Sequence, residues 1–379
     1  MSMLLNEEQT LLKDAAHGFF EEKLPIPALR KLRDDKDTTG FDRDRWREMA
    51  EMGWAGVLVP EAYGGVEFGY KGLGQILEES GRTLAASPLV STVLLCAPLV
   101  LAAGNEIQKQ EVLGAIAGGE RILALALEET QRHAPTRIAT TAEKSGDGYR
   151  LNGAKTFVLD GHVADQLIVI ARTSGANDDP RGLSLFLVDG NAKGLTRRRT
   201  VMVDSRNAAN ITLDNVDVGA DALLGPLDDG FAVLEPVLDG ARIGLAAEML
   251  GNGLEAFTRT LEYLKMREQF GVPIGSFQAL KHRAALMFCE IELTTSAVLE
   301  ALTALDEKRN DVPQLASLAK AKACEMLELV SNEAVQLHGG IGMTDEEEIG
   351  FFLKRARVAQ QTFGDAIFHR DRYATLMGF

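Results

Sequence analysis

The sequence is poor in cysteine. Three cysteines occur among 379 residues, Cys96, Cys289 and Cys324, and they lie far apart without a C-x-x-C spacing. An odd and sparse set argues against a disulfide framework and predicts reduced thiols, as in a cytoplasmic protein. The six histidines show no metal-ligand spacing, so no metal site is expected.

Positive charge and long apolar runs are also scarce. Lysine and arginine number 40 against 55 acidic residues, a net charge of −15, which argues against nucleic acid or an anionic membrane as a partner. The longest apolar stretch, 88–103, is interrupted by Ser91, Thr92 and Pro98 and falls short of a membrane span. The acidic N-terminus lacks the basic and apolar regions of a signal peptide.

What remains is the composition of a globular protein, with 46% hydrophobic and 25% charged residues in a chain long enough for two or three domains. Helical spacing of apolar residues marks 1–120, short apolar runs between glycine turns mark 121–229, and helical spacing returns over 230–379. We therefore predict a multi-domain α+β fold: an N-terminal all-α domain, a middle β-barrel or sandwich, and a C-terminal four-helix bundle.

Element boundaries follow from local signals. Asn6 with Gln9 has the pattern of a capping box, Pro313 suits a first helical turn, and Asp345 is expected to cap the last helix. The expected strands are 122–127, 155–159, 166–171 and 183–188. The expected C-terminal helices are 230–266, 277–308, 313–338 and 345–376.

The stretch 263–278 interrupts the helical pattern once, at Gly271 and Pro273. The guanidinium of Arg267 presents a planar fork of donors that matches phosphate oxygens. Phe270 offers an apolar face, Gly271 allows close approach of the backbone, and Gln278 can bond a ribose or a base edge. The alternative is an ordinary helix-turn-helix with one surface arginine.

A second motif, Gln336-Leu-His-Gly-Gly-Ile-Gly-Met-Thr, places three glycines after a helix. Glycines there let the backbone pack against a pyrophosphate and adenosine. A helix that simply ends in a glycine-rich exit is the alternative.

The segment Arg267-x-Gln-Phe-Gly-x-Pro-Ile resembles the flavin-dinucleotide motif of the acyl-CoA dehydrogenases, and the glycine motif follows at the family's spacing. The resemblance covers nearly the whole chain and implies FAD as cofactor, an acyl-CoA substrate and a dimer or tetramer. It also implies that these two segments hold the adenine-diphosphate end of a flavin seated in the neighbouring subunit. The residues carried over for that role are Arg267, Phe270, Gln278, Gln336, Gly339 and Gly340.

The segments that seat the flavin ring in the family are altered here. In the family, a strand that reads roughly Thr-Glu-Pro is followed by Gly-Ser-Asp. The matching residues 127–133 of this sequence lack the Thr, the Pro and the Gly-Ser-Asp. The family's Trp-Ile-Thr-Asn-Gly becomes 157–161, where Leu159 has no hydroxyl for flavin N5. Asp160 would place a carboxylate near a ring that gains negative charge on reduction, which is electrostatically unfavourable.

Removal of the α-proton of an acyl-CoA needs a carboxylate. The resemblance places the family's two base positions at Phe363 and Ala241, and neither is a carboxylate. Asp365 is the nearest substitute, although its alternative role is to cap the terminal helix. Weaker candidates for the base are Asp239, Glu235 and Glu129.

Asp239 and Arg242 match family positions that touch the CoA chain, the alternative being a solvated helix face. The turn 56–65 resembles one near the family's acyl pocket, or is a plain glycine-rich connection.

The residues for the adenine-diphosphate end of the flavin are kept, and those for its ring are altered. This combination resembles the small subunit of family members that are encoded by two genes, a type associated with pimeloyl-CoA or steroid side-chain desaturation. We therefore expect an FAD-dependent acyl-CoA dehydrogenase, acting on an acyl-CoA of fatty acid or steroid side-chain degradation. The missing base leaves open that this chain acts beside a second subunit that carries it. Electron-transfer flavoprotein is the expected acceptor. A self-sufficient dehydrogenase that uses Asp365 and a non-catalytic acyl-CoA-binding or scaffold protein of the same fold are the alternatives.

Overall fold

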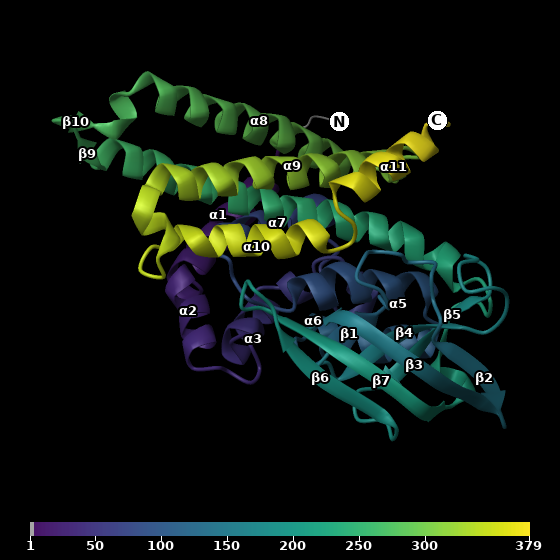
Figure 1. Ribbon diagram of the computed structural model, residues 1–379. Coiled ribbons are helices and arrows are strands. Elements are labelled where there is room, and N and C mark those ends of the chain that lie inside the picture. Colours follow the sequence, from purple (N-terminus) through teal and green to yellow (C-terminus); the bar gives the residue numbers. More distant parts are fainter. Residues whose placement is uncertain (1–3) are drawn as a thin grey trace. The chain divides into compact units, whose positions relative to one another are not determined.

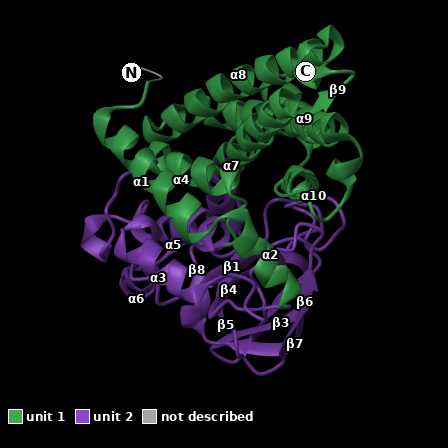
Figure 2. Cartoon of the chain, turned by 90° about the vertical axis from the view of Figure 1, so that its left-hand side faces the viewer, with its two compact units in different colours: residues 1–35, 70–86, 242–379 green, residues 36–69, 87–241 purple. Residues whose placement is uncertain are grey.

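A computed structural model of the chain describes residues 4–379 (Figure 1). The chain divides into two compact units, coloured separately in Figure 2. The helical unit comprises residues 1–35, 70–86 and 242–379, and the sheet unit comprises 36–69 and 87–241. The predicted domains 1–120, 121–229 and 230–379 divide the chain by sequence order, whereas these units follow the packing.

In the helical unit, α1 packs on α4 and the long C-terminal helices pack on one another. Asn6 and Gln9 form the predicted capping box of α1, and Pro313 lies in the first turn of α9 as expected. The helices that lie wholly in this unit are α1 (Glu7–Lys23), α2 (Ile26–Asp34), α4 (Tyr70–Arg82), α8 (Gln278–Asp306), α9 (Val312–His338), α10 (Ile349–Gln361) and α11 (Ala366–Leu376). Helix α7 (Gly230–Met266) continues into it from the sheet unit.

Two glycines let α4 and α7 approach closely. A Cβ atom at Gly81 would lie 2.1 Å from the carbonyl oxygen of Glu248, and one at Gly251 would lie 1.8 Å from that of Glu78. Any side chain at either position would therefore force these helices apart.

The predicted helix 345–376 is wrong in two respects. It is two helices, because Phe363 and Gly364 adopt φ angles of +58° and +102° and leave the helical conformation. Asp345 does not cap a helix. Its carboxylate instead binds Arg30 at 2.9 Å and Arg33 at 2.6 Å, and α10 begins only at Ile349.

The sheet unit is built on one eight-stranded sheet of order β6-β7-β3-β2-β4-β5-β8, with β1 paired in parallel to β4. Strand β4 is buried on both faces, which explains its uninterrupted apolar run. The strands are β1 (Leu123–Ala126), β2 (Thr141–Ser145), β3 (Gly148–Leu159), β4 (Gln166–Arg172), β5 (Leu183–Asp189), β6 (Leu195–Val201), β7 (Asn207–Val218) and β8 (Leu223–Leu224). The unit also contains α3 (Arg43–Glu51), a π-helix (Leu89–Cys96), α5 (Ala97–Ala103) and α6 (Glu106–Ala117).

Across residues 4–379, no helix is long and apolar enough to cross a membrane. The same residues contain no group of three or more histidine, cysteine, aspartate or glutamate side chains that could hold a metal ion.

Candidate functional site

The arginine turn is a tight hairpin at the end of α7. Strands β9 (Glu268–Gln269) and β10 (Val272–Pro273) pair antiparallel, and Phe270 and Gly271 between them both have positive φ, at +54° and +78°. Two such residues in succession are typical of a type I′ turn. The backbone of Arg267 is fixed at both ends, since its N–H donates to Tyr263 and its carbonyl accepts from the N–H of Ile274, both at 2.8 Å.

The side chains of this turn point outward. The guanidinium of Arg267 has no hydrogen bond or ion pair with any residue of 4–379, and the residue is exposed. The Phe270 ring is 92% exposed and meets Phe277 edge-to-face, with ring centroids 6.0 Å apart. Gln278 lies at the first position of α8 and contacts His282 at 3.3 Å between side-chain nitrogens.

The glycines of the glycine motif directly follow α9, and the backbone of the first two is not covered by neighbouring atoms. Gly339 has φ +64° and ψ −141°, a conformation that side chains rarely allow. A Cβ atom on Gly339 or Gly340 would find nothing within 4 Å, whereas one on Gly342 would lie 2.8 Å from the carbonyl oxygen of Val335. The first two glycines are therefore open to a ligand, and the third serves packing.

The two motifs lie at the same end of the helical unit. Tyr263 in the last turns of α7 stacks on His338 at the end of α9, with ring centroids 4.5 Å apart and planes 25° apart. His338 is buried and its Nδ1 bonds the carbonyl of Ala334 at 2.7 Å. Figure 1 shows β9 and β10 at the end of the unit where α9 leads into α10.

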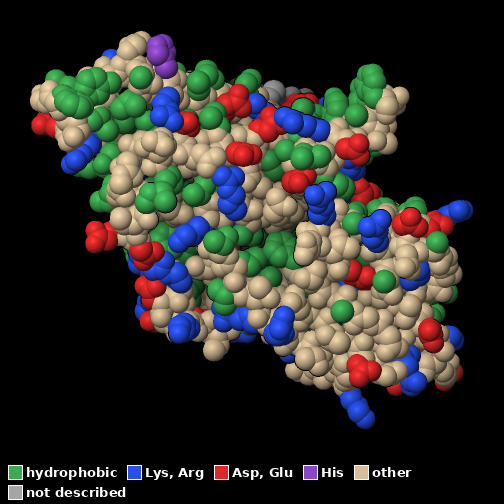
Figure 3. Space-filling view, in the orientation of Figure 1, with side chains coloured by type: hydrophobic (Ala, Val, Ile, Leu, Met, Phe, Trp, Pro, Cys, Tyr) green, Lys and Arg blue, Asp and Glu red, His purple; other side chains and the backbone are tan. Residues whose placement is uncertain are grey.

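Hydrophobic side chains gather at this end on the face shown in Figure 3. The most exposed of those carried by the turn and the glycine exit are Met266 at 74%, Phe270 at 92% and Met343 at 80%. An unpartnered arginine thus lies among apolar side chains and open backbone, a combination suited to a phosphate joined to a flat ring.

The segment that the resemblance predicts to lie at the flavin ring, residues 127–133 of the sheet unit and called the ring-side segment below, has different chemistry. Glu129, after β1, accepts from Lys155 Nζ at 2.7 Å and from the backbone N–H groups of Ala139 at 2.6 Å and Thr140 at 3.0 Å. Burial opposes ionisation of Glu129, but Lys155 and these N–H groups outweigh it and hold the carboxyl pKa below its ordinary value. Burial lowers the pKa of Lys155 to about 8, against the opposing effect of Glu129.

Two further acids on the ring side are bonded within the unit. His133 Nδ1 lies 2.5 Å from a carboxylate oxygen of Glu128. Asp160 has φ +54°, and its carboxylate accepts from the Ser91 hydroxyl at 2.6 Å.

The residue that the resemblance predicts at the base position, Phe363, lies at the junction between α10 and α11. Phe363 is buried there, and Asp365 caps α11 by accepting from the N–H of Phe368 at 2.9 Å. Lys320 of α9 is fully buried and donates to the carbonyls of Ala359 at 3.1 Å, Gln360 at 3.3 Å and Gly364 at 2.9 Å. Burial lowers the pKa of the Lys320 ammonium.

The comparison with known families decides the identity. Three domains of the acyl-CoA dehydrogenases match: the N-terminal domain over residues 6–120, the middle domain over 124–216 and the C-terminal domain over 228–376. The chain belongs to the acyl-CoA dehydrogenase family. Its members are FAD-dependent oxidoreductases that act on a CH–CH bond of an acyl-CoA.

Individual acyl-CoA dehydrogenases are similar along their whole length. The short-chain-specific acyl-CoA dehydrogenase of Megasphaera elsdenii is 32% identical, over 94% of each chain. A solved structure of the Tcur3481-Tcur3483 steroid ACAD is 35% identical, with a TM-score of 0.87 over 98% of each chain. The ChsE4-ChsE5 complex of Mycobacterium tuberculosis is 26% identical, with a TM-score of 0.90 over 100% of each chain.

The two candidate substrate residues of this acyl-CoA dehydrogenase, Asp239 and Arg242, are buried and do not form a solvated helix face. Asp239 is 2% exposed and Arg242 is 0% exposed, on α7. The guanidinium of Arg242 lies 5.7 Å from the centre of the Phe368 ring. Ala241, the other residue that the resemblance predicts at a base position, is also fully buried.

The sequence analysis did not single out two buried lysines near the predicted site residues, Lys155 and Lys320. The signal for Lys320 was its place in the run Ala319-Lys-Ala, on a helix face that also carries Ala316 and Cys324 and is otherwise small and apolar. Lysine is so often at the surface that this signal is weak.

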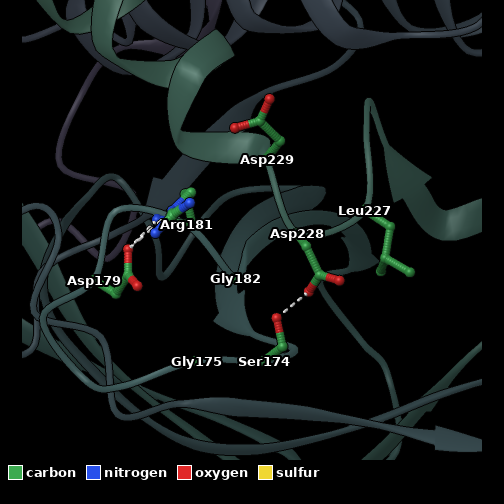
Figure 4. A pocket seen from close by; sticks show the side chains of 8 residues that line it. All are labelled: Ser174, Gly175, Asp179, Arg181, Gly182, Leu227, Asp228 and Asp229. Carbon is green, nitrogen blue, oxygen red and sulfur yellow. Dashed lines mark hydrogen bonds and ion pairs between the residues drawn. The ribbon is translucent and has the colours of Figure 1, made fainter.

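A pocket of about 450 Å³ opens elsewhere in the sheet unit, where the loop before β5 meets the residues before α7 (Figure 4). Asp179 and Arg181 form an ion pair there with a 3.8 Å separation, and the Asp228 carboxylate accepts from Ser174 at 2.8 Å. None of the predicted site residues lines it.

Proposed function

We propose that this chain is a subunit of an FAD-dependent acyl-CoA dehydrogenase that introduces an α,β double bond into an acyl-CoA thioester. The observation that carries the proposal is the pairing of the arginine turn with the open glycine exit. Arg267 is held by its backbone and unpartnered in its side chain, and Gly339 and Gly340 present bare backbone at the same end of the unit.

In this proposal the adenine-diphosphate half of a flavin rests on these residues. Arg267 binds a phosphate oxygen through its guanidinium, and Gly339 and Gly340 receive the dinucleotide along the backbone. Phe270 contributes an apolar face, and Gln278 and Gln336 supply amide groups for the sugar or base. When bound, FAD supplies the acceptor for the hydride that leaves the β-carbon.

Two further roles concern the acyl-CoA substrate: positioning of the thioester chain and removal of the α-proton. Asp239 and Arg242 of α7 are proposed to position the thioester chain, which their burial favours over a solvated role. The α-proton needs a carboxylate that Phe363 and Ala241 do not provide, and Asp365 is engaged as a helix cap. We therefore propose that the base comes from a second acyl-CoA dehydrogenase-like subunit, in a dimer or tetramer that passes electrons to electron-transfer flavoprotein.

The test is co-expression with the acyl-CoA dehydrogenase-like chain encoded nearest to this gene. We expect a yellow complex whose flavin is bleached by a member of a panel of straight-chain and steroid side-chain acyl-CoA esters. Arg267→Ala should lower the flavin content of the complex at least tenfold, whereas Lys265→Ala, at an exposed position in the last turn of α7, should leave it unchanged.

A specific observation favours one alternative, a non-catalytic acyl-CoA-binding or scaffold protein. Neither family base position carries a carboxylate. A colourless complex that is stabilised by CoA esters would establish this alternative, and a yellow homodimer that turns over acyl-CoA would overturn the need for a second subunit.

A further inference from the structure

The ring-side segment is joined to the sheet by a buried charge pair. The Lys155 side chain is 0% exposed and lies between Glu129 and the carbonyl of Leu127, at 2.7 and 3.2 Å from its Nζ. The backbone N–H groups of Ala139 and Thr140 also donate to the Glu129 carboxylate. These bonds connect 127–129 and 139–140 to strand β3.

A second pair lies beside the first. The His133 side chain is 2% exposed and bonds the Glu128 carboxylate, which also accepts from the N–H of Ala134 at 3.5 Å. The backbone carbonyl of Glu128 accepts from the N–H of Thr156 in β3 at 2.8 Å. Side chain and backbone of Glu128 are thus both bonded within the sheet unit.

Asp160, at the other ring-side segment, continues the pattern. The Ser91 hydroxyl donates to its carboxylate, and the preceding residue, Leu159, has no hydroxyl to offer. The Ser91 hydroxyl is therefore directed at the chain's own acid.

An isoalloxazine ring has requirements that this arrangement does not meet. Its nitrogen and carbonyl acceptors need hydrogen-bond donors that are not already engaged, and reduction adds negative charge that acids disfavour. Here the N–H groups of Ala134, Ala139 and Thr140 and the Ser91 hydroxyl all donate to the chain's own carboxylates. These four donors are therefore not available to a flavin ring, and the acids beside them disfavour its reduction.

We infer that the flavin-ring seat of this chain is closed by its own contacts, the Glu129–Lys155 ion pair and the Glu128–His133 hydrogen bond, so that any flavin it helps to bind has its ring in another chain. The inference rests on the proposed function, in which this chain binds the adenine-diphosphate end of FAD. It deepens that proposal because it assigns this chain to the adenine end alone. Each pair of unlike chains then holds one flavin.

The first experiment uses the purified chain alone and equilibrium dialysis against FAD and against ADP. We expect the two dissociation constants to agree within twofold, with bound FAD keeping the visible spectrum and fluorescence of the free molecule. FAD bound at least tenfold more tightly than ADP, with a structured visible band and quenched fluorescence, would overturn the inference. No binding of either ligand would agree with a closed ring seat, but it would count against the proposed binding of the adenine-diphosphate end by this chain.

The second experiment uses the co-expressed complex and its flavin stoichiometry. One flavin for each pair of unlike chains is expected, and two would refute the closed seat while leaving the dehydrogenase function intact. Glu129→Gln and Asp160→Asn should retain the flavin content within experimental scatter, whereas Arg267→Ala should lower it tenfold or more. If Asp160→Asn changed the flavin spectrum with unchanged circular dichroism, the ring would be in contact with this chain and the inference would fail.

Discussion

Lys320→Met is the most informative single change in the helical unit. The last four carbonyls of α10 have no partner within that helix, as at every helix end. Lys320 reaches from α9 to two of them, Ala359 and Gln360, and to Gly364 beyond the break. Met has a similar length and no ammonium, so the change removes these three bonds while preserving much of the packing.

The magnitude follows from two opposing terms. Three buried carbonyls left without this donor cost about 1–3 kcal/mol each, a gross loss of roughly 3–9 kcal/mol. Against this, a fully buried ammonium no longer has to be desolvated, which returns several kcal/mol. We therefore expect a net loss of about 2–4 kcal/mol, or roughly 5–12 °C in Tm for a unit of 150–250 residues.

Thermal unfolding and amide hydrogen exchange measure the global and local effects. The amides of 362–369 should exchange faster in Lys320→Met, because the junction loses its support from α9. Lys322→Met is the matched control, since Lys322 on the same helix forms a partly exposed pair with Glu290 worth about 0–1 kcal/mol. Equal Tm values for the two variants, or unchanged exchange at 362–369, would refute the reasoning.

Three further changes test other contacts. Asp365→Ala should cost about 1 kcal/mol through the lost cap and Asp365→Asn almost nothing; loss of acyl-CoA turnover with unchanged Tm in Asp365→Asn would instead make Asp365 the base. Arg33 and Arg30 hold the pKa of Asp345 down to about 2, so its stabilisation is present above its ordinary 3.8 and is lost as the pH falls towards 2. The Tm of Asp345→Asn should therefore lie below wild type at pH 7 and approach it below pH 4. Arg355→Met should lower the free energy of unfolding by about 3–5 kcal/mol, because it removes the guanidinium that pairs with the buried Glu248 carboxylate, and a loss under 1 kcal/mol in urea unfolding would contradict this.

Helices of the C-terminal half were predictable because their signals are local. The predicted 230–266 agrees with α7 in full, and the predicted 277–308 and 313–338 differ from α8 and α9 by one or two residues at their ends. Apolar spacing, Gly271 and Pro313 were sufficient for these boundaries.

The sequence-based predictions of secondary structure failed where a residue far away in the sequence determines the local conformation. Asp345 looked like a cap from its neighbours, yet Arg30 and Arg33, more than 300 positions earlier, bind its carboxylate. Strand β6 was not anticipated because its three consecutive arginines hide the alternation of an edge strand. A break at Phe363 was equally hidden, since a phenylalanine with positive φ depends on the contacts that Lys320 provides from α9.

The two halves of the candidate site differ in how the chain uses its polar groups, and this difference supports the assignment more strongly than the motifs do. A binding surface must keep donors unengaged until the ligand arrives, whereas a structural segment engages them during folding. Arg267 has no partner within the described chain, and Gly339 leaves its backbone uncovered. Glu129 and Lys155, by contrast, are bonded to each other and to neighbouring backbone. A chain that holds a whole flavin would be expected to keep both halves open, so the asymmetry supports our proposal of a subunit that binds one end of a shared cofactor.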